Sequence, residues 1–217
     1  MKIGILGTGI VGETLGTKLV QLGHTVKMGS RIAANEKGVS WSKKNGPNAT
    51  SGTFADAAKF GSMLFNCTSG LASLQALKLA GSENLSEKVL VDVSNPLDFS
   101  KGMPPFLSIA NTDSLGEQIQ RTFPRVKVVK ALNTLNASLM TNPKSLAQGD
   151  HNLFICGNDS DAKKIVVSLL TSFGWNEGNI YDLGDISNAR GTEMILPLWI
   201  RLMGKFQSPM FQFKIVR

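Results

Sequence analysis

The apolar positions of the chain fall into short continuous runs separated by longer stretches of helical periodicity. The runs are rich in Val, Ile and Leu, which is typical of buried β-strands, and the stretches between them repeat apolar residues every three or four positions, as amphipathic helices do. We predict strands at Lys2–Gly7, Thr25–Met28, Thr50–Thr53, Met63–Thr68, Lys88–Val93, Val126–Ala131, Asn152–Cys156 and Ile180–Leu183. We predict helices at Val11–Leu22, Phe54–Phe60, Leu71–Leu79, Ser114–Thr122, Ser160–Phe173 and Ser187–Met203.

This alternation of strands and helices indicates an α/β protein. It predicts a Rossmann-type, doubly wound and mostly parallel sheet with a small C-terminal α/β extension that ends in a long helix. We expect one domain over residues 1–136 and a small lobe over residues 137–217 packed on the same sheet, unless the two form one continuous domain. Pro197 is expected to kink or break the last helix near Leu196. The loop Asn95–Thr112 is long enough to be a lid or a binding loop.

The composition narrows the class of protein. Hydrophobic residues make up 42% and charged residues 18% of the 217 residues, which is typical of a globular protein and excludes a disordered one. The apolar run Ile195–Ile200 is too short to cross a bilayer and the opening lacks a cleavage site, so we expect a cytoplasmic protein without membrane contact. Cys67 and Cys156 form no C-x-x-C pair, so we expect buried thiols and no metal site.

The net charge of +7 raises the question of an acidic partner. The basic residues are scattered and are not interleaved with a stripe of stacking aromatics, so we expect no nucleic-acid binding. A basic surface equally suits a phosphate-rich cofactor, an acidic electron carrier, or simple solubility.

A glycine-rich turn follows the first predicted strand. The residues Gly7-Thr8-Gly9-Ile10-Val11-Gly12 read G-x-G-x-x-G between a strand and an amphipathic helix, which is the context that the dinucleotide-binding motif requires. The first glycine allows the tight turn, the second lets the backbone approach a pyrophosphate, and the third lets helix and strand pack closely. The helix N-terminus offers unpaired N–H groups to the phosphates. A glycine-rich turn without a ligand is the alternative interpretation.

The end of the second strand indicates which dinucleotide binds. Proteins that bind NAD place an Asp or Glu about 20 residues after the motif, where it accepts hydrogen bonds from the ribose 2′-OH. Here the segment reads "KMGSR", and no acidic residue lies between Glu13 and Glu36. Ser30 and Arg31 can donate hydrogen bonds to a 2′-phosphate, and Thr8 can add a hydroxyl. We therefore expect NADP, bound by residues 1–136.

Small polar residues follow three other predicted strands. In a doubly wound sheet, ligands bind beyond the carboxyl ends of the strands. The hydroxyl, amide and backbone groups at these ends suit a carboxamide and a flat ring, although each residue is also typical of a turn or a helix cap. The candidate cofactor-binding residues here are Thr68, Ser69, Asn95, Asn133 and Thr134.

The chain offers no evident proton donor for this site. Neither His24 nor His151 falls at a strand end that faces the crevice, and there is no long helical second domain of the kind that many ketone or imine reductases use. We therefore assign no catalytic residue. We expect an acceptor that handles its own protons, which favours a flavin or a deazaflavin as co-substrate.

The ordered segments "GTGIVG", "GSR", "VDVSNP", "KALNTLNA" and "LGDISNARGTEMILPLWIRLM" resemble the NADP-dependent deazaflavin oxidoreductase family. They are also similar to the cytosolic reductase domain of the six-transmembrane ferric reductases. The resemblance covers nearly the whole chain and implies hydride exchange between NADPH and a bound deazaflavin or flavin. It also implies a homodimer.

The resemblance assigns Gly7 to Gly12 to the pyrophosphate, Ser30 and Arg31 to the 2′-phosphate, and Asn133 and Thr134 to the nicotinamide pocket. The chain departs from the family in two places. Family members often carry a further basic residue directly behind the Ser-Arg pair, whereas here Lys37 is the next one. Deazaflavin enzymes also tend to place a larger apolar group around Thr68, Ser69 and Gly70.

Two other functions fit the same nucleotide loop. One is a reductase of a small carbonyl or imine compound, which would need a lysine or tyrosine near the nicotinamide. The other is a non-catalytic NADPH sensor that docks a partner through its basic C-terminal helix, with Trp199, Phe206, Phe211 and Phe213 available for contact. The spacing of Ile195, Leu198 and Leu202 favours a core or dimer helix over a docking helix.

Overall fold

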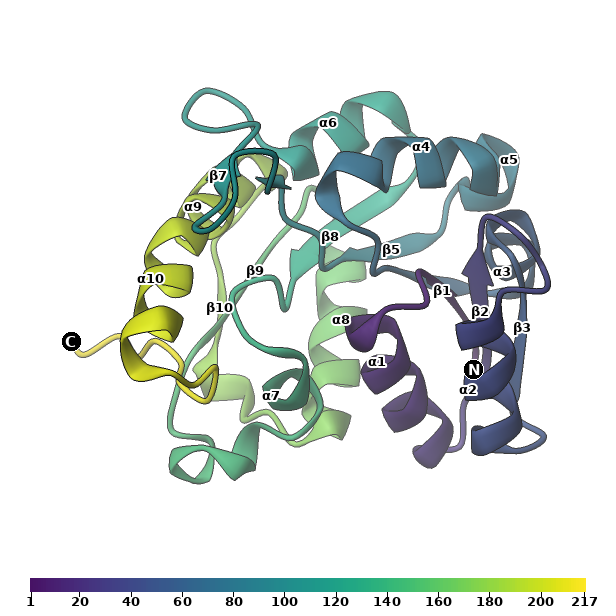
Figure 1. Ribbon diagram of the computed structural model, residues 1–217, viewed down its shortest axis with the longest axis horizontal. Coiled ribbons are helices and arrows are strands. Elements are labelled where there is room, and N and C mark those ends of the chain that lie inside the picture. The colour runs from purple at the N-terminus through teal and green to yellow at the C-terminus, as the bar shows by residue number, and fades with distance from the viewer.

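The computed structural model describes residues 1–217, and its centre is one eight-stranded sheet (Figure 1). The strands lie in the order β10-β9-β8-β5-β4-β1-β2-β3, and every neighbouring pair is parallel except β8 and β9. Their bounds are β1 Lys2–Leu6, β2 Thr25–Ser30, β3 Ala49–Thr53, β4 Met63–Asn66, β5 Val89–Asp92, β8 Lys127–Ala131, β9 Leu153–Cys156 and β10 Ile180–Asp182. The predicted Rossmann-type, mostly parallel sheet is confirmed.

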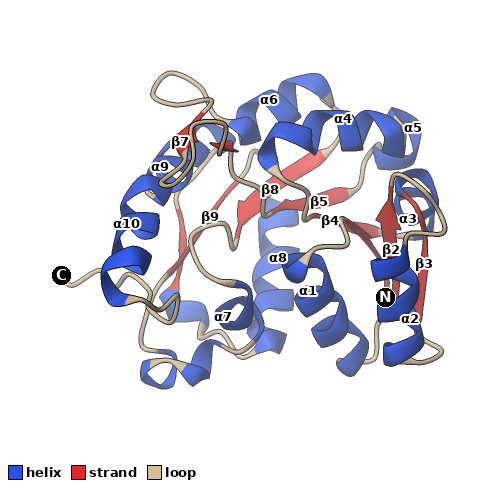
Figure 2. Cartoon of the chain, viewed as in Figure 1, coloured by secondary structure: helices blue, strands red, loops and turns tan.

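Helices cover both faces of the sheet (Figure 2). Their bounds are α1 Ile10–Gln21, α2 Glu36–Asn45, α3 Phe54–Phe60, α4 Gly70–Ala80, α5 Ser82–Leu85, α6 Leu115–Thr122, α7 Ala137–Thr141, α8 Ser160–Phe173, α9 Ala189–Met194 and α10 Leu196–Phe206. Helices α1, α2, α7 and α8 pack on one face, and α3, α4, α5 and α6 on the other. Successive residues of a strand enter opposite cores: Val89 and Val91 of β5 face α1 and α8, whereas Leu90 faces α4 and α6.

The strand order reverses between β1 and β4. From β1 the chain adds β2 and then β3 toward one edge, and from β4 it adds β5 and β8 toward the other. The loops that leave β1 and β4 therefore part to opposite faces, which opens a crevice beyond the carboxyl ends of these two strands. This is the place where a doubly wound sheet binds its ligand.

Helices α2, α5 and α7 and a hairpin in the loop after β5 were not predicted from the sequence. Helix α2 was not predicted because only Gly38 and Trp41 of its ten residues are buried, so it shows no apolar stripe. Asn35 starts it, with its side chain accepting a hydrogen bond from the Gly38 N–H. The long loop after β5 contains a two-stranded hairpin, β6 Leu97–Asp98 with β7 Phe106–Leu107.

The predicted last helix is two helices. The break lies at Ile195, with Pro197 in the first turn of α10, as the proline predicted. Of the three predicted apolar positions, Leu198 is 52% exposed and is not part of the core, whereas Ile195 and Leu202 are half-buried. Ile195 packs against the buried cluster of Leu196, Trp199 and Ile200. Because the helix restarts after the break, its buried face is set by the contact with the tail and not by the spacing before it.

The C-terminal aromatic residues contact one another. The Trp199 and Phe211 rings stack with centroids 5.1 Å apart, and Phe206 meets Phe211 edge-on at 5.4 Å. Leu97 of the hairpin and Phe213 pack against the same cluster. These rings therefore hold α10, the hairpin and the tail together, and most of them are not free for a partner.

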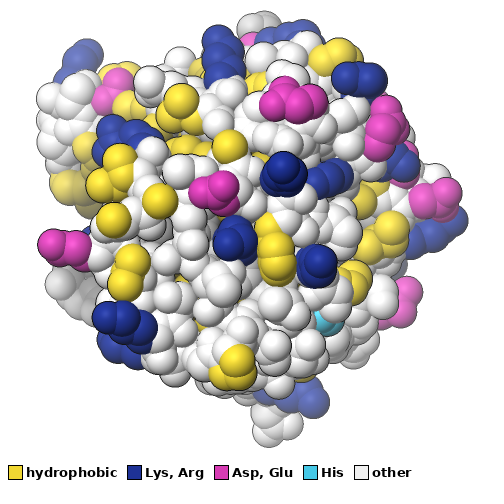
Figure 3. Space-filling view, turned by 90° about the vertical axis from the view of Figure 1, so that its right-hand side faces the viewer, with side chains coloured by type: hydrophobic (Ala, Val, Ile, Leu, Met, Phe, Trp, Pro, Cys, Tyr) yellow, Lys and Arg dark blue, Asp and Glu magenta, His cyan; other side chains and the backbone are white.

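The surface and the side-chain clusters add three observations. No helix combines the length and apolar character that a membrane span requires. No group of three or more His, Cys, Asp and Glu side chains is arranged to hold a metal ion. On the face shown in Figure 3, the Lys and Arg side chains are dispersed, with Asp and Glu among them.

Candidate functional site at the carboxyl ends of the central strands

The turn between β1 and α1 has the geometry that its glycines predict. Gly7 has a φ of +122°, and a Cβ there would lie 2.6 Å from the Cys67 carbonyl oxygen. A Cβ at Gly12 would lie 2.2 Å from the Gly7 carbonyl oxygen. Gly9 has no atom within 4 Å of the position where a Cβ would be, and its φ of −85° suits any residue. Gly7 and Gly12 are therefore required by the fold, whereas the space at Gly9 is open to a ligand.

The N-terminus of α1 is ready for an anion. No side chain caps this helix, so the N–H groups of its first turn lack a protein acceptor. Glu13 is the only acidic residue in that turn. Uncapped N–H groups beside open space fit a pyrophosphate.

The candidate 2′-phosphate corner lies at the end of β2. Ser30 is buried, and its hydroxyl donates to the Ile32 carbonyl at 2.5 Å and accepts from the Ile32 N–H at 3.2 Å. Arg31 is exposed and forms no ion pair. Ser30 thus shapes the turn, and Arg31 is the cation that is free to meet a phosphate.

The unpredicted helix α2 begins beside the glycine turn and carries a second exposed cation. A Cβ at Gly38 would lie 3.4 Å from the Thr8 methyl group, so the start of α2 packs beside the glycine turn. Lys37, the preceding residue, is exposed. The position of Lys37 therefore depends on a helix that the hydrophobic pattern does not reveal.

A cavity of about 480 Å³ adjoins the glycine turn. Val11 contributes to it from α1, and the rest of the wall comes from the ends of β4 and β5, the start of α4, and the hairpin strand β6 with the loop that follows it. The lining residues are Val11, Cys67, Thr68, Ser69, Gly70, Leu71, Val93, Ser94, Asn95, Leu97, Asp98, Phe99 and Ser100. The predicted residues Thr68, Ser69 and Asn95 therefore meet at one cavity.

Gly70 is a site residue that the sequence analysis did not single out. A Cβ at Gly70 would lie 2.0 Å from the Asn95 carbonyl oxygen, so only glycine permits this approach between α4 and the end of β5. This contact joins two walls of the cavity. A glycine just after a strand end was the available signal.

Asn133 and Thr134 lie behind the cavity wall and do not line it. The Asn133 amide donates to Asn95 Oδ1 at 2.9 Å, and the Asn95 amide donates to the Asn133 carbonyl at 2.8 Å. Thr134 Oγ1 is buried without a hydrogen-bond partner. Asn133 therefore acts on the cavity through Asn95, and the assignment of both residues to the nicotinamide pocket stays a prediction.

The cavity wall holds no Lys, Tyr or His, and its two ionisable side chains, Cys67 and Asp98, are poor proton donors at neutral pH. Burial and the nearby Asp92 carboxylate raise the pKa of the Cys67 thiol. The Cys67 side chain is half-buried, whereas the sequence predicted a buried thiol. Hydrogen bonds from Ser100 lower the pKa of Asp98, which keeps it a carboxylate. His24 contacts the N-terminal amine, and His151 contacts the Pro143 carbonyl, both outside the cavity.

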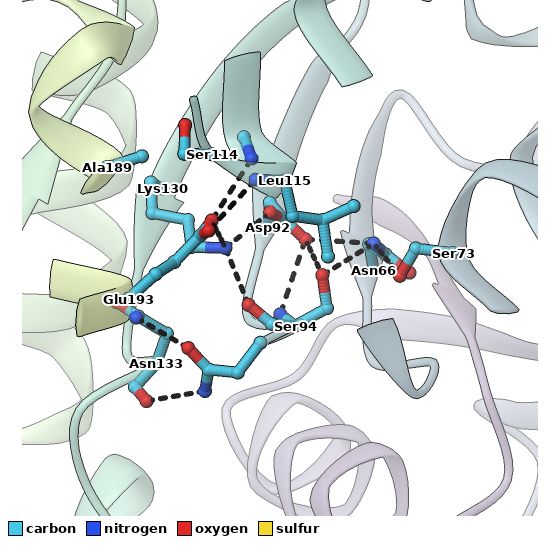
Figure 4. Close-up of polar contacts among 12 residues, drawn as sticks. Asn66, Ser73, Asp92, Ser94, Ser114, Leu115, Lys130, Asn133, Ala189 and Glu193 are labelled. Atoms are coloured by element: carbon cyan, nitrogen blue, oxygen red, sulfur yellow. Dashed lines mark hydrogen bonds and ion pairs between the residues drawn. The ribbon is translucent and has the colours of Figure 1, made fainter. Parts of the chain in front are cut away.

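A buried polar network lies beneath the cavity (Figure 4). Lys130 of β8 contacts Asp92 Oδ2 at 2.8 Å and Glu193 Oε1 at 2.7 Å, and none of the three side chains is more than 1% exposed. Burial disfavours the charged Lys130, but the adjacent carboxylates outweigh it and raise its pKa. The sequence analysis missed all three residues.

Arg190 fastens α9 to α6 through Glu117. The guanidinium donates to both carboxylate oxygens, at 2.9 and 2.6 Å. These hydrogen bonds, with a further one from Ser114, lower the pKa of Glu117. The pKa of Glu117 is lower in the folded state than in the unfolded one. The ion pair therefore stabilises the fold fully above the ordinary carboxyl pKa of about 4.5, and this stabilisation is lost as the pH falls through the pKa of the folded state.

Arg190→Gln should therefore lower the free energy of unfolding by about 1 kcal/mol at pH 7, a small value because Arg190 is 39% exposed. Urea unfolding from pH 7 to pH 3 should show this difference shrinking below pH 4.5. Arg201→Gln is the control, since Arg201 contacts only the Pro197 carbonyl of its own helix. A difference that stays constant down to pH 3 would contradict the assignment.

Fold and site together define a dinucleotide-binding oxidoreductase class. Comparison with known proteins supports this class. Residues 2–96 match the family model described as NADP oxidoreductase, coenzyme F420-dependent. An F420-dependent NADP reductase from Methanocaldococcus jannaschii is 31% identical over 220 residues, covering 96% of this chain and 95% of that protein. The chain belongs to the family of coenzyme F420-dependent NADP oxidoreductases and is an NADP-dependent oxidoreductase.

Two further comparisons bear on the shape and length. A solved structure described as a putative F420-dependent NADP-reductase from Arthrobacter sp. FB24 is 50% identical, covers 100% of both chains and superposes with a TM-score of 0.94. The metalloreductase STEAP3 of Rattus norvegicus is 30% identical over 209 residues. The match covers 91% of this chain but only 38% of that longer protein.

Proposed function

We propose that the chain transfers a hydride between NADP(H) and a flavin-type ring, with a deazaflavin as the favoured acceptor class. The observation that carries the proposal is the cavity of about 480 Å³ beside the glycine turn, whose wall holds no Lys, Tyr or His side chain. Reduction of a carbonyl or an imine calls for a proton donor next to the reacting carbon. A flavin-type ring takes a hydride directly, so orientation and shielding from water are what the protein must supply.

One group of residues binds the phosphates of the cofactor, and a second group, at the cavity, orients its nicotinamide. The first-turn N–H groups of α1 bind the pyrophosphate above Gly9, and Arg31 with Lys37 pairs with the 2′-phosphate. Thr68 and Asn95 present a hydroxyl and an amide at the cavity, where they can orient the carboxamide. When bound, NADPH supplies the hydride to the acceptor ring.

Apolar side chains provide the surface for a flat ring. Val11, Leu71, Leu97 and Phe99 approach the cavity from α1, α4 and the hairpin. Their contact excludes water from the reacting atoms. The small residues Thr68, Ser69 and Gly70 leave more room than the larger apolar group typical of deazaflavin enzymes, which keeps a flavin within the proposal.

The relatives support a deazaflavin acceptor. The Methanocaldococcus jannaschii protein, which matches nearly end to end, is named an F420-dependent NADP reductase, and coenzyme F420 is a deazaflavin. The alternatives have less support: the cavity offers a carbonyl or imine reductase no Lys, Tyr or His, and of the two aromatic residues on α10 Trp199 is buried, which leaves only Phe206 exposed for a docking partner. The family resemblance also leads us to propose a cytoplasmic homodimer, and sedimentation equilibrium of the purified protein would test the dimer.

Arg31→Ala should lower the affinity for NADPH by about 10- to 100-fold and leave that for NADH nearly unchanged, because a charge-assisted hydrogen bond contributes about 1.5–3 kcal/mol. Fluorescence titration with both nucleotides measures this. Lys37→Ala should give a smaller loss of the same kind. Lys43→Ala, on the far end of α2, is the matched control. Equal losses for NADPH and NADH would show that Arg31 does not read the 2′-phosphate.

A further inference from the structure

The buried Lys130 has no unused hydrogen-bonding capacity. Its amine contacts Asp92 Oδ2 at 2.8 Å, the Ser94 carbonyl oxygen at 2.5 Å and Glu193 Oε1 at 2.7 Å (Figure 4). An ammonium group has three donors, so all of them are satisfied within the protein. Lys130 is 1% exposed and therefore does not reach the cavity. It can act on the reaction only through the groups that it holds.

The charges of this cluster come from three distant segments. Asp92 ends β5, Lys130 lies in β8 and Glu193 lies in α9, so two carboxylates share one ammonium. The second negative charge meets the N-terminus of α6, where the Leu115 and Gly116 N–H groups donate to the Glu193 carboxylate at 2.8 and 3.1 Å. A helix N-terminus stabilises a negative charge, so the partial positive charge of α6 and the Lys130 ammonium together offset the two carboxylates.

The same cluster holds two walls of the cavity. Asp92 Oδ1 accepts from the Ser94 hydroxyl at 2.6 Å and from the Asn66 amide at 2.8 Å. Asn66 Oδ1 in turn accepts from the Thr68 hydroxyl at 2.7 Å. Ser94 is therefore fixed both at its hydroxyl, by Asp92, and at its carbonyl, by Lys130.

A third link runs from α9 to the cavity. The Asn133 amide donates to the Thr192 carbonyl at 3.0 Å as well as to Asn95. Thr192 precedes Glu193, so these two adjacent residues of α9 both connect, through Asn133 and Lys130, to the wall formed by Ser94 and Asn95. Burying three charges is costly, and apolar residues of similar volume usually pack as well. What the charges add here is a fixed orientation for the wall groups.

We propose that Lys130, Asp92 and Glu193 form a positioning centre that holds Thr68, Ser94 and Asn95 in the geometry needed to orient the nicotinamide for hydride transfer. None of the three is a catalytic residue. The inference rests on the proposed function only in that the cavity receives the nicotinamide end of NADP(H).

The test compares Asp92→Asn and Glu193→Gln with the exposed control Glu83→Gln. Each of the first two changes keeps the side-chain shape and leaves one carboxylate to pair with Lys130. We expect both variants to fold and to bind 2′,5′-ADP, which occupies only the adenosine half, within twofold of wild type. The limiting rate of hydride transfer from bound NADPH to a deazaflavin should fall about 10- to 100-fold, with KM changed much less, because small misplacements of reacting atoms are costly.

A second readout needs no acceptor. The fluorescence anisotropy of bound NADPH reports how firmly the nicotinamide is held, and it should fall in both variants but not in Glu83→Gln. If none of the flavins and deazaflavins supplied accepts a hydride from NADPH in the wild-type protein, the proposed function fails. The anisotropy would still test the positioning centre. Wild-type transfer rates and anisotropy in folded variants would overturn the proposal. Loss of the folded state in both variants would also overturn it, since the cluster would then serve stability alone.

Discussion

Gly9→Val is expected to reduce the affinity for NADPH by at least about 100-fold without weakening the fold. The protein has no atom within 4 Å of the added Cβ, and the backbone of Gly9 at φ −85° is one that valine adopts readily. The branched side chain would instead occupy the space where a pyrophosphate approaches the N–H groups of α1. NADPH fluorescence titration together with thermal unfolding measures both properties.

Gly12→Val provides the contrast. Its Cβ would lie 2.2 Å from the Gly7 carbonyl oxygen, so this variant should lose stability as well as binding. The two glycines are three residues apart in the same turn, yet one is required by the fold and the other by the ligand. Near wild-type affinity in Gly9→Val would place the dinucleotide somewhere other than this turn.

Lys130→Met should lower the free energy of unfolding by about 3–5 kcal/mol. The change removes the one cation between Asp92 and Glu193 and leaves two carboxylates buried together, which is far more costly than losing a balanced pair. Urea unfolding at pH 7 measures the effect. Lys164→Met is the matched control: Lys164 pairs with Asp161 on the surface, where both side chains are more than three-quarters exposed, so its loss should cost under about 1 kcal/mol. Equal costs in the two variants would contradict the buried-charge account.

The parts of the fold that the sequence predicts are those decided by local pattern. The strands of the sheet other than the polar β3 follow from short apolar runs, and the glycine turn follows from the spacing of Gly7, Gly9 and Gly12. The same reasoning fails for α2, whose stability comes from the Asn35 cap and the contact of Trp41 with the core, because a mostly polar helix has no period to detect.

The site likewise contains residues that the sequence predicts and residues that it does not reveal. Thr68, Ser69 and Asn95 were predicted because strand ends in a parallel sheet meet at one edge, and they do meet at the cavity. Lys130 and Glu193 were missed because they lie 63 residues apart in the sequence, and a charged residue in an apolar strand carries no sign of its partner. Gly70 was not predicted as a binding residue because, although it follows a strand end, its close approach to Asn95 appears only in three dimensions.

The central claim is a direct hydride transfer from NADP(H) to a flavin-type ring in a cavity that holds no Lys, Tyr or His side chain. The most direct measurement uses NADPH with deuterium at both C4 positions and an oxidised deazaflavin, followed by mass spectrometry of the reduced product. One deuterium bound to carbon in the reduced deazaflavin is the predicted result. A reduced deazaflavin without deuterium, or NADPH that binds tightly but is never oxidised by a deazaflavin or a flavin, would contradict the account.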